Sequence, residues 1–355
     1  MKNLLLLLSF PFLFGSCLKD EPFKLEYAGF EPRKINDDWQ VSTPENENID
    51  RDILVRAYKL LYRDDRFTMA RSLLVFRNGR LVSEAYPNNP DDIYAIYNIQ
   101  SCTKSFTSIL AGIAIQNNEM GQLSERLYDI YPEYFDSDVS KRGITIEDAL
   151  TMRTGLEFDN SAHTAELYQT DGSSVKYILT RQKLYDPCTI MNYNDGAPHL
   201  VSKVIEAKTG KALRDYAGEK LFTPLNIYDW DWESAKDGIT FGAFSLYLKP
   251  RDFGKVGQLL LQNGKWENKT IIDSAYLSEA TKIHVSANYN SEPYGYYFWI
   301  LPAFNGYAAL GHGGQFLFVA PDKKLVVVYT AWPYTSSQFF DQRNELMNII
   351  VNACN

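Results

Sequence analysis

Apolar and polar residues follow one another in two different rhythms along this chain. Residues 49–63 carry apolar side chains at the three- and four-residue spacing of a helix. Residues 72–86 instead form two apolar runs around Asn78-Gly79, the strongest short signal for a hairpin turn. Residues 101–116 return to helical spacing and include several small side chains, which predicts a closely packed central helix.

The remaining pattern predicts helices in the middle of the chain and strands towards its end. Further helices are expected at 145–152, 173–182, 197–208, 212–221, 250–263 and 337–353. Short aromatic and β-branched runs predict strands at 241–248, 294–301, 307–310, 315–320 and 324–331. Strands near both ends that share one antiparallel sheet, with a mostly helical insert at about 118–236, make the predicted fold class α+β.

The first residues have the pattern of a processed, lipid-anchored start. Residues 4–14 form a mostly apolar run that is too short to span a bilayer but has the length found in signal peptides. Phe14-Gly15-Ser16-Cys17 resembles the lipobox of bacterial lipoproteins, in which the cysteine is lipidated and becomes the new N-terminus. We therefore predict a signal peptide at 1–16 and a lipid such as palmitate on Cys17. The alternative is an ordinary cleaved signal in which Cys17 is incidental.

The residues after Cys17 predict a tether and a destination. Residues 18–21, Leu-Lys-Asp-Glu, look like the surface-export signal of Bacteroidetes lipoproteins, although a solvated charged linker has the same composition. Residues 17–45 form the predicted lipidated tether, which leaves 46–355 for the catalytic domain. The expected location is the outer membrane of a Gram-negative bacterium, with the protein either exposed at the cell surface or facing the periplasm.

Composition narrows the classes of function. The chain has 355 residues, 45% of them hydrophobic, with 24 Tyr and 20 Phe, which is enough to build a large core. Its formal net charge of −8 argues against a nucleic-acid partner, because no basic region is present to neutralise phosphates. Four Cys and four His show neither a disulfide framework nor zinc-ligand spacing, so no cofactor and no metal are expected.

Ser101 and Lys104 are the first candidate for chemistry. Their Ser-x-x-Lys spacing puts both side chains on one face of a helix, a single turn apart. A serine hydroxyl is a weak nucleophile until a base takes its proton, and a lysine can be that base if its pKa is lowered. The alternative is that Ser101 only caps the helix. The same spacing recurs at Ser173 and Lys176, where we predict a helix cap and a solvated charge.

Tyr193-Asn194-Asp195 is the second candidate and lies just before the helix predicted at 197–208. A phenol in this loop could lie against Ser101 and Lys104, and a phenolate beside an ammonium group is a competent general base. Taken alone, Tyr193 fits a packed loop tyrosine better.

The third candidate is Gly-His-Gly-Gly-Gln at 311–315, between two predicted strands. Glycines allow the backbone to approach a ligand, and the N–H that follows them can form half of an oxyanion hole. The alternative is a glycine-rich hairpin turn. Lys-Thr-Gly at 208–210 spells a related motif, but it lies at the end of a predicted helix, where glycine is a stop signal.

In this order and spacing, the three motifs resemble those of the serine β-lactamase and penicillin-binding-protein superfamily. Within it, the chain looks like the class C-related group of esterases, D-aminopeptidases and 6-aminohexanoate-dimer hydrolases. Supporting stretches lie at 101–115, 144–156, 250–266 and 311–329, and the match spans about residues 39–350. The resemblance implies an antiparallel sheet flanked by helices, a mostly helical inserted lobe and an active site between them.

The resemblance also implies roles for individual residues. Ser101 matches the acylated nucleophile, while Lys104 and Tyr193 would share proton transfer. The backbone N–H groups of Ser101 and Gln315 would form the oxyanion hole. The substrate-binding positions along the site would be Asp195, His312, Gly313 and Gly314.

Two departures from the family pattern bear on the substrate. His312 stands where β-lactamases have Lys, so the charged anchor for a β-lactam carboxylate is missing or weaker. Asp195 stands where Asn is usual, and a carboxylate facing Lys104 would hold that lysine protonated, which would make Tyr193 the better general base. Both departures favour ester or amide hydrolysis over efficient β-lactam turnover.

The predicted function is that of a serine hydrolase that forms an acyl-enzyme on Ser101. Its expected partner is a small ester or amide, a peptide or a modified glycan, and its only contact with the membrane is the lipid anchor. One alternative is a β-lactamase or D-Ala-processing peptidase, and another is a non-catalytic sensor or binding lipoprotein on the same scaffold. An α/β-hydrolase is excluded because Gly-x-Ser-x-Gly is absent.

Overall fold

The two ends of the chain meet in one antiparallel sheet. The computed structural model describes residues 24–286, 292–334 and 339–354, and within them six strands follow the order β2-β1-β11-β10-β9-β8. The strands are β1 Ala70–Arg77, β2 Arg80–Ala85, β8 Trp299–Leu301, β9 Gly306–Leu310, β10 Phe316–Ala320 and β11 Leu325–Ala331. Leu74 of β1 lies opposite Val328 of β11. The predicted α+β fold with a shared sheet is confirmed.

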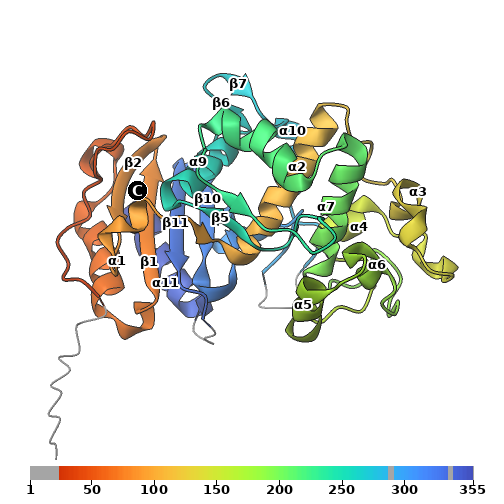
Figure 1. The fold of residues 1–355 in the computed structure, drawn as a ribbon. Helices are drawn as coiled ribbons and strands as arrows, with labels where there is room; N and C mark the ends of the chain where they lie inside the picture. The colour runs from red at the N-terminus through yellow and green to blue at the C-terminus, as the bar shows by residue number, and fades with distance from the viewer. Residues whose placement is uncertain (1–23, 287–291, 335–338, 355) are drawn as a thin grey trace, which may run out of the picture.

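Asn78 and Gly79 make the predicted turn between β1 and β2. Both residues have positive φ angles, 51° and 80°, which is the backbone conformation of the tight turn that matches the twist of paired strands. In Figure 1 these orange strands stand beside the blue strands from the C-terminal part of the chain.

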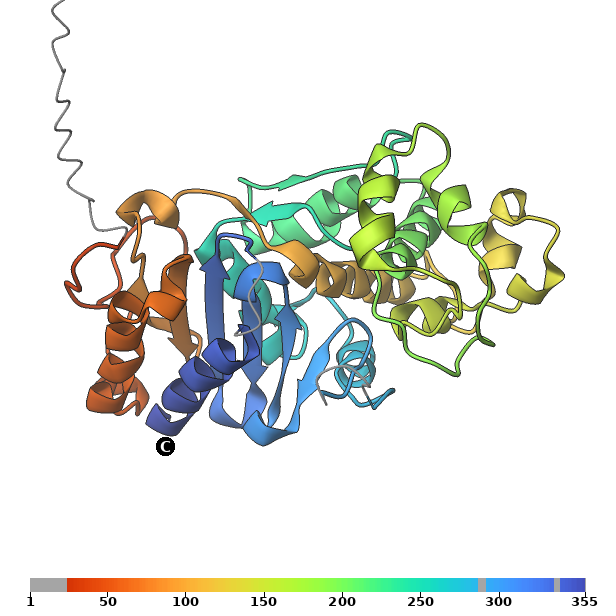
Figure 2. The same ribbon diagram turned by 90° about the horizontal axis from the view of Figure 1, so that it is seen from below.

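Helices cover the sheet. In the view of Figure 2, α1 Arg51–Arg63 and α11 Phe339–Ala353 lie together against the sheet. α9 Pro250–Leu261 packs on β1, β10 and β11. Gly257 lets α9 come close, because a Cβ there would lie 2.5 Å from Val326 Cγ1 and 2.7 Å from Leu317 Cδ1. The helix therefore packs directly onto β11 and onto β10, the strand that follows the loop with the third sequence motif.

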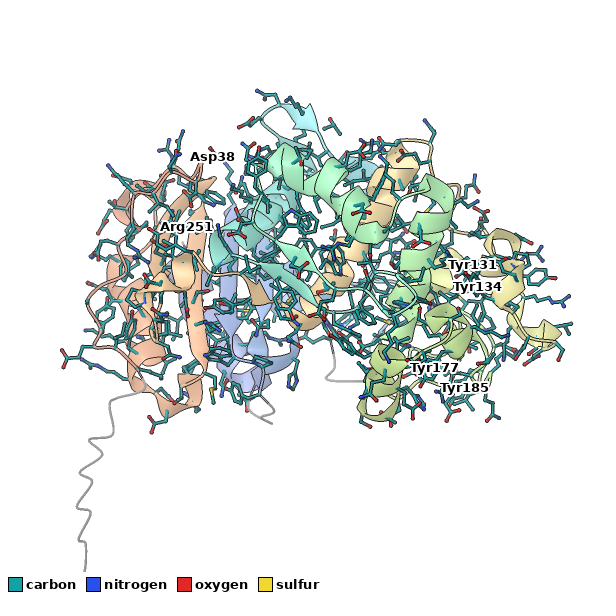
Figure 3. The ribbon with its side chains drawn as sticks, viewed as in Figure 1. Asp38, Tyr131, Tyr134, Tyr177, Tyr185 and Arg251 are labelled. Atoms are coloured by element: carbon teal, nitrogen blue, oxygen red, sulfur yellow. The ribbon has the colours of Figure 1, made fainter. Side chains whose placement is uncertain are left out.

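The helical lobe occupies the other half of the molecule (Figure 1). Its axis is α2 Thr103–Gln116, which packs against α7 Gly196–Thr209. The other helices are α3 Leu127–Ile130, α4 Ile146–Leu150, α5 Asn160–Gln169, α6 Ser174–Leu179, α8 Leu213–Ala217 and α10 Ser274–Ala280. Much of the tyrosine content serves this lobe: Tyr131, Tyr134 and Tyr177 all belong to it (Figure 3), and the first two rings pack edge to face.

The strand predicted at 241–248 is wrong for most of its length. Only β5 Leu246–Leu248 is a strand, in a small sheet with β3 Tyr97–Asn98 and β4 Asp231–Trp232. The carbonyls upstream of β5 accept hydrogen bonds from side chains instead of from a neighbouring strand. The donors are Ser202 to Thr240, Trp232 to Phe241, Thr107 to Gly242 and Lys104 to Ala243.

Two other predicted elements differ in detail from the structure. The strand predicted at 294–301 begins only at Trp299, because Tyr297 has a φ of 61° and the N–H of Gly295 donates to the carbonyl of Phe298, which closes a turn. The helix predicted at 212–221 is α8 followed by a π-helical turn, Gly218–Phe222. A small hairpin, β6 Lys265–Trp266 and β7 Lys269–Thr270, was not predicted.

The part of the predicted tether that the structure describes lies on the domain. Phe30 is buried in the core, and Val41 pairs with Leu81 at the edge of β2. Arg251 of α9, labelled in Figure 3, donates to Glu84 of β2 and Asp37 of the tether. The predicted signal peptide and Cys17 lie outside the described residues. No helix among those described is long and apolar enough to cross a membrane.

Candidate active site

Ser101 lies in a short 3-10 turn, Gln100–Cys102, that runs directly into α2. Gln100 has a φ of 55°, which is unusual for a residue with a side chain, and its backbone N–H donates to Asn98 Oδ1 at 2.8 Å. Such strain needs support from the surroundings and is concentrated at functional sites. The bend presents the Ser101 hydroxyl to the cavity at the start of the central helix.

Lys104 lies beneath Ser101 on the first turn of α2 and is 1% exposed. Its Nζ donates to Ser101 Oγ at 2.8 Å, Asp195 Oδ1 at 2.6 Å and the carbonyl of Ala243 at 3.2 Å. Three acceptors match the three N–H bonds of an ammonium group. The contacts of this side chain are therefore those of a protonated lysine.

The electrostatics of Lys104 agree with these contacts. Burial disfavours its charge and is the largest single effect, but the Asp195 carboxylate and Tyr193 together outweigh it and raise the pKa of Lys104 above its ordinary value. Asp195, just before α7, is 7% exposed. The Asp195 carboxylate therefore faces the amine of Lys104, which is the arrangement expected to hold that lysine protonated.

Tyr193 lies in the loop before α7 and packs against aromatic rings. Its ring packs 5.4 Å from Trp299 and 6.1 Å from Tyr294, and Lys104 Nζ lies 4.9 Å from its centre. Burial raises the pKa of the Tyr193 phenol, while Lys104 and a hydrogen bond with Ser101 act in the opposite direction. The phenol is therefore neutral at neutral pH and lies beside the nucleophile.

The loop 311–315 forms the opposite edge of the site. Gly313 has a φ of 81°, and a Cβ there would lie 2.8 Å from the carbonyl oxygen of Trp332. The Gln315 side chain fixes the loop, because its amide both donates to and accepts from the backbone of Ala331. Partial burial lowers the pKa of the His312 imidazole. His312, Gly314 and Gln315 line the cavity, whereas Gly313 is buried behind them and shapes the turn.

The two other motif matches are structural. Ser173 caps α6 by accepting from the N–H of Lys176. Gly210 ends α7 with a φ of 71°. Neither belongs to the residues that line the cavity.

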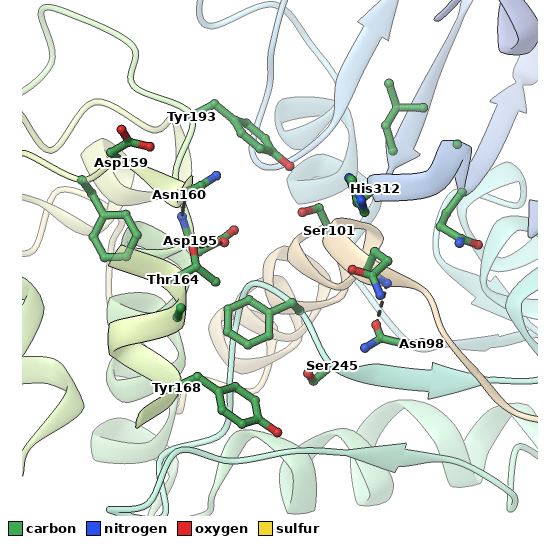
Figure 4. Close-up of a pocket in the computed structure, with 18 of the residues that line it drawn as sticks. Asn98, Ser101, Asp159, Asn160, Thr164, Tyr168, Tyr193, Asp195, Ser245 and His312 are labelled. Carbon is green, nitrogen blue, oxygen red and sulfur yellow. Dashed lines mark hydrogen bonds between the residues drawn. The ribbon is translucent and has the colours of Figure 1, made fainter. Parts of the chain in front are cut away.

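A cavity of about 1050 Å³ opens in front of Ser101 (Figure 4). Sequence reasoning missed one wall of it, the inner face of α5, and several residues from other elements. The lining residues from α5 and its cap are Asp159, Asn160, Thr164, Ala165, Tyr168 and Gln169. Others that were not predicted are Asn98, Gln100, Phe158, Asn192, Phe244, Ser245, Leu310 and Arg343, while Gly311 of the third motif and Trp299 also line the cavity.

α5 escaped prediction because its pattern is not that of a core helix. Within α5 the core position is held by Leu167, and the side chains that face the cavity are mostly polar. A signal was nevertheless present: Asp159 caps the helix by accepting from the N–H of Ser161, and helix-favouring residues follow.

The described residues contain no group of three or more His, Cys, Asp or Glu side chains that could hold a metal ion. The chemistry that these residues can perform is the activation of a serine hydroxyl by a neighbouring amine and phenol.

An antiparallel sheet, a helical lobe and a cluster of half-buried Ser101, buried Lys104 and half-buried Tyr193 are the features to compare with known families. The sequence profile of the Beta-lactamase family matches residues 68–350, so the chain belongs to that family. The family includes esterases, amidases and penicillin-binding proteins. No protein with a curated description matches the sequence.

Solved structures share this fold. A Bacillus anthracis protein named as a 6-aminohexanoate-dimer hydrolase is 21% identical, with 92% of this chain and 90% of that one covered and a TM-score of 0.74. A family VIII carboxylesterase is 16% identical, with 90% and 100% covered and a TM-score of 0.67. A penicillin-binding protein homologue from Caulobacter crescentus is 12% identical, with 85% and 97% covered and a TM-score of 0.68.

The buried pair Lys104–Asp195 makes a prediction for stability. Lys104→Met leaves the carboxylate buried without its counter-charge, so the free energy of unfolding should fall by roughly 3 kcal/mol. Adding Asp195→Asn removes the orphaned charge and should recover part of that loss. Denaturant unfolding of both single variants and the double variant measures the coupling, and strictly additive losses would contradict it. Arg126→Met, in the exposed pair with Asp129, is the control and should change little.

Proposed function

We propose that this protein is a serine hydrolase that cleaves an ester or amide through an acyl-enzyme on Ser101. The observation that carries the proposal is the contact between the Ser101 hydroxyl and the buried amine of Lys104, with Tyr193 beside both and an open cavity in front. A nucleophile and a base within hydrogen-bond reach, with the base oriented by a third group, are what covalent catalysis requires.

Proton transfer follows from the charge states of the cluster. With Lys104 charged and Tyr193 neutral, neither group can accept a proton until one has been lost. Once Lys104 is an amine, or Tyr193 a phenolate, it takes the proton of Ser101 as Oγ attacks the carbonyl carbon. The bond from the carbonyl carbon to the leaving group breaks, and the same proton passes to that group. Water then attacks the acyl-enzyme and gives a proton to the same base. The bond to Ser101 Oγ breaks, Oγ takes that proton, and the acid is released. Because Asp195 opposes the loss of the proton from Lys104, Tyr193 is the favoured acceptor.

The oxyanion of the tetrahedral intermediate would be bound by the backbone N–H groups of Ser101 and Gln315. Gln315 follows the glycine loop and is held rigidly by its two hydrogen bonds to Ala331. Fixed donors of this kind stabilise developing negative charge without reorganisation, which is the largest single contribution in many hydrolases.

The cavity favours a substrate without a carboxylate anchor. His312, whose pKa is lowered, is neutral at neutral pH and offers no fixed positive charge. Arg343 also lines the cavity but donates to Glu292, which balances its charge. Small esters or amides, peptides and modified glycans therefore fit better than β-lactams, and the resemblance to proteins named as a 6-aminohexanoate-dimer hydrolase and a carboxylesterase supports this choice.

We also propose that Cys17 carries a lipid that tethers the enzyme to the outer membrane. The support is the apolar run followed by Phe14-Gly15-Ser16-Cys17. The described chain begins at Lys24, whose ammonium donates to the carbonyls of Leu61 and Asp64 at the end of α1. This end of the domain would then face the anchor.

The nucleophile is tested by covalent labelling. A fluorophosphonate probe should add one adduct to the intact mass of the wild type and none to Ser101→Ala, because Ser101 supplies the hydroxyl that lies against Lys104. Ser173→Ala, in the other Ser-x-x-Lys match, is the control and should label normally. Labelling of Ser101→Ala, or of neither protein, would refute the proposal, and fast nitrocefin turnover would favour a β-lactamase instead.

The pH dependence of labelling follows from the raised pKa values of Lys104 and Tyr193. The reactive form has lost one proton from this pair, so the rate of Ser101 labelling should rise with pH and keep rising through about pH 7 to 9. A stopped-flow or quench series in matched ionic strength measures it. A rate that is flat or falls over this range would contradict the assigned charge states.

Lipidation is tested by metabolic labelling in the native host. Radiolabelled palmitate should be incorporated into the wild type and lost in Cys17→Ala, because the thiol is the attachment point. Cys188→Ala removes an exposed thiol elsewhere and should retain the label. Label that persists in Cys17→Ala would show that the lipid is attached to another residue and would contradict the proposal.

A further inference from the structure

The second oxygen of Asp195 is bound by α5. Oδ1 accepts from Lys104, while Oδ2 accepts from Thr164 Oγ1 at 2.6 Å. One helical turn before Thr164, Asn160 Oδ1 accepts the backbone N–H of Asp195 at 2.9 Å. Figure 4 shows Asn160 and Thr164 both close to Asp195.

These contacts fix the carboxylate on both sides. A carboxylate with one oxygen on an ammonium and the other on a hydroxyl donor cannot turn away without breaking a strong, charge-assisted hydrogen bond. The backbone bond to Asn160 holds the start of α7 at the same place. α5 thus controls where the negative charge next to Lys104 lies.

We infer that Thr164, assisted by Asn160, is a positioning residue that keeps the Asp195 carboxylate against Lys104 and so sets the pH at which Ser101 can be acylated. The inference rests on the proposed function. A hydroxyl that donates to an anion stabilises the anionic form, and the anion in turn stabilises the ammonium beside it. The Thr164 hydroxyl donates to Asp195 and forms no hydrogen bond with Ser101 or Lys104 in the described part of the chain, so it acts through Asp195.

The other titratable groups around Lys104 do not supply a second negative charge. Tyr193 and Cys102 face it, and Tyr294 faces Tyr193 and Asp195 from the segment before β8. Burial raises the pKa of all three, which leaves them neutral at neutral pH.

The charged groups on and beside α5 are engaged elsewhere. Glu166 pairs with Arg181 and Tyr177 on the α6 side. The His163 ring accepts the backbone N–H of Asp159, and the Asp159 carboxylate accepts from Ser161. Glu233 accepts from Tyr168 and Tyr247. Among the described residues facing Lys104, the carboxylate is therefore that of Asp195, and Thr164 is its hydroxyl donor.

The position of α5 also connects this charge to the substrate. Ala165, Tyr168 and Gln169 of the same helix line the cavity together with Thr164. A ligand that lies against α5 therefore contacts the helix on which the Asp195 carboxylate depends.

The test is the pH profile of Ser101 labelling in variants of Thr164. Thr164→Val removes the donor, so the midpoint of the profile should move to lower pH by about half to one unit. Thr164→Ser keeps the hydroxyl and should restore the wild-type midpoint. Thr170→Val, which removes a hydroxyl bond to Glu166 at the other end of α5, controls for loosening of the helix and should leave the midpoint in place.

A second variant separates positioning from general destabilisation. Asp195→Asn should move the midpoint further down than Thr164→Val, because the whole negative charge is lost. Adding Thr164→Val to Asp195→Asn should cause no further shift. An equal shift in both backgrounds, or none in the wild-type background, would overturn the inference.

Direct titration keeps the inference separate from the proposed function. NMR of the full chain with ¹³C-labelled lysine side chains follows the Lys104 ammonium itself, assigned by its loss in Lys104→Met. Its pKa should fall in Thr164→Val and be regained in Thr164→Ser. If Ser101 of the wild type cannot be labelled, the proposed function fails, while this titration still decides whether Thr164 controls Lys104. An unchanged Lys104 pKa in Thr164→Val overturns the inference whatever the labelling shows.

Discussion

The ion pair between Lys104 and Asp195 is the constraint on which the site depends. It joins the first turn of α2 to the start of α7, and the same ammonium reaches Ser101 and the carbonyl of Ala243. Removing an ammonium group from water costs several kcal/mol, and this cost is tolerable only where every N–H has an acceptor and a counter-charge lies close. The segments that carry Ser101, Asp195 and Ala243 must therefore be fixed in position for the ion pair to form.

The fold supplies those places by bringing distant parts of the chain together. Pairing of β1 with β11 joins the N-terminal and C-terminal strands in one sheet. The loop 311–315 of that sheet is thereby held beside the start of α2. In the stretch before β5, backbone carbonyls accept hydrogen bonds from side chains of α2 and α7. These bonds link the two helices of the lobe through one segment. α5 then completes the site from outside, on the second oxygen of Asp195.

Much of this arrangement could be predicted from the sequence. Asn78-Gly79 predicted the hairpin, and the spacing of apolar residues predicted α1, α2, α9 and the shared sheet. The three motifs gathered in one cavity. α5 could not be found from the spacing of apolar residues, because the face of this helix that points inward lines a cavity and carries mostly polar side chains. Residues 241–245 look like a strand, since an apolar run does not reveal whether side chains or a neighbouring strand will take its carbonyls. The charge of Lys104 depends on which way Asp195 turns, and Thr164 decides that from thirty-one residues earlier in the chain.

The most direct test of the whole account is a crystal structure of the protein after reaction with a fluorophosphonate. The phosphonyl group stands in for the tetrahedral intermediate, with its P=O oxygen at the position of the oxyanion. Phosphorus should be bonded to Ser101 Oγ, with that oxygen within hydrogen-bond distance of the backbone N–H groups of Ser101 and Gln315, and with Lys104 still on Asp195. Phosphorus on another residue, or an oxygen that points away from these two N–H groups, would contradict the account.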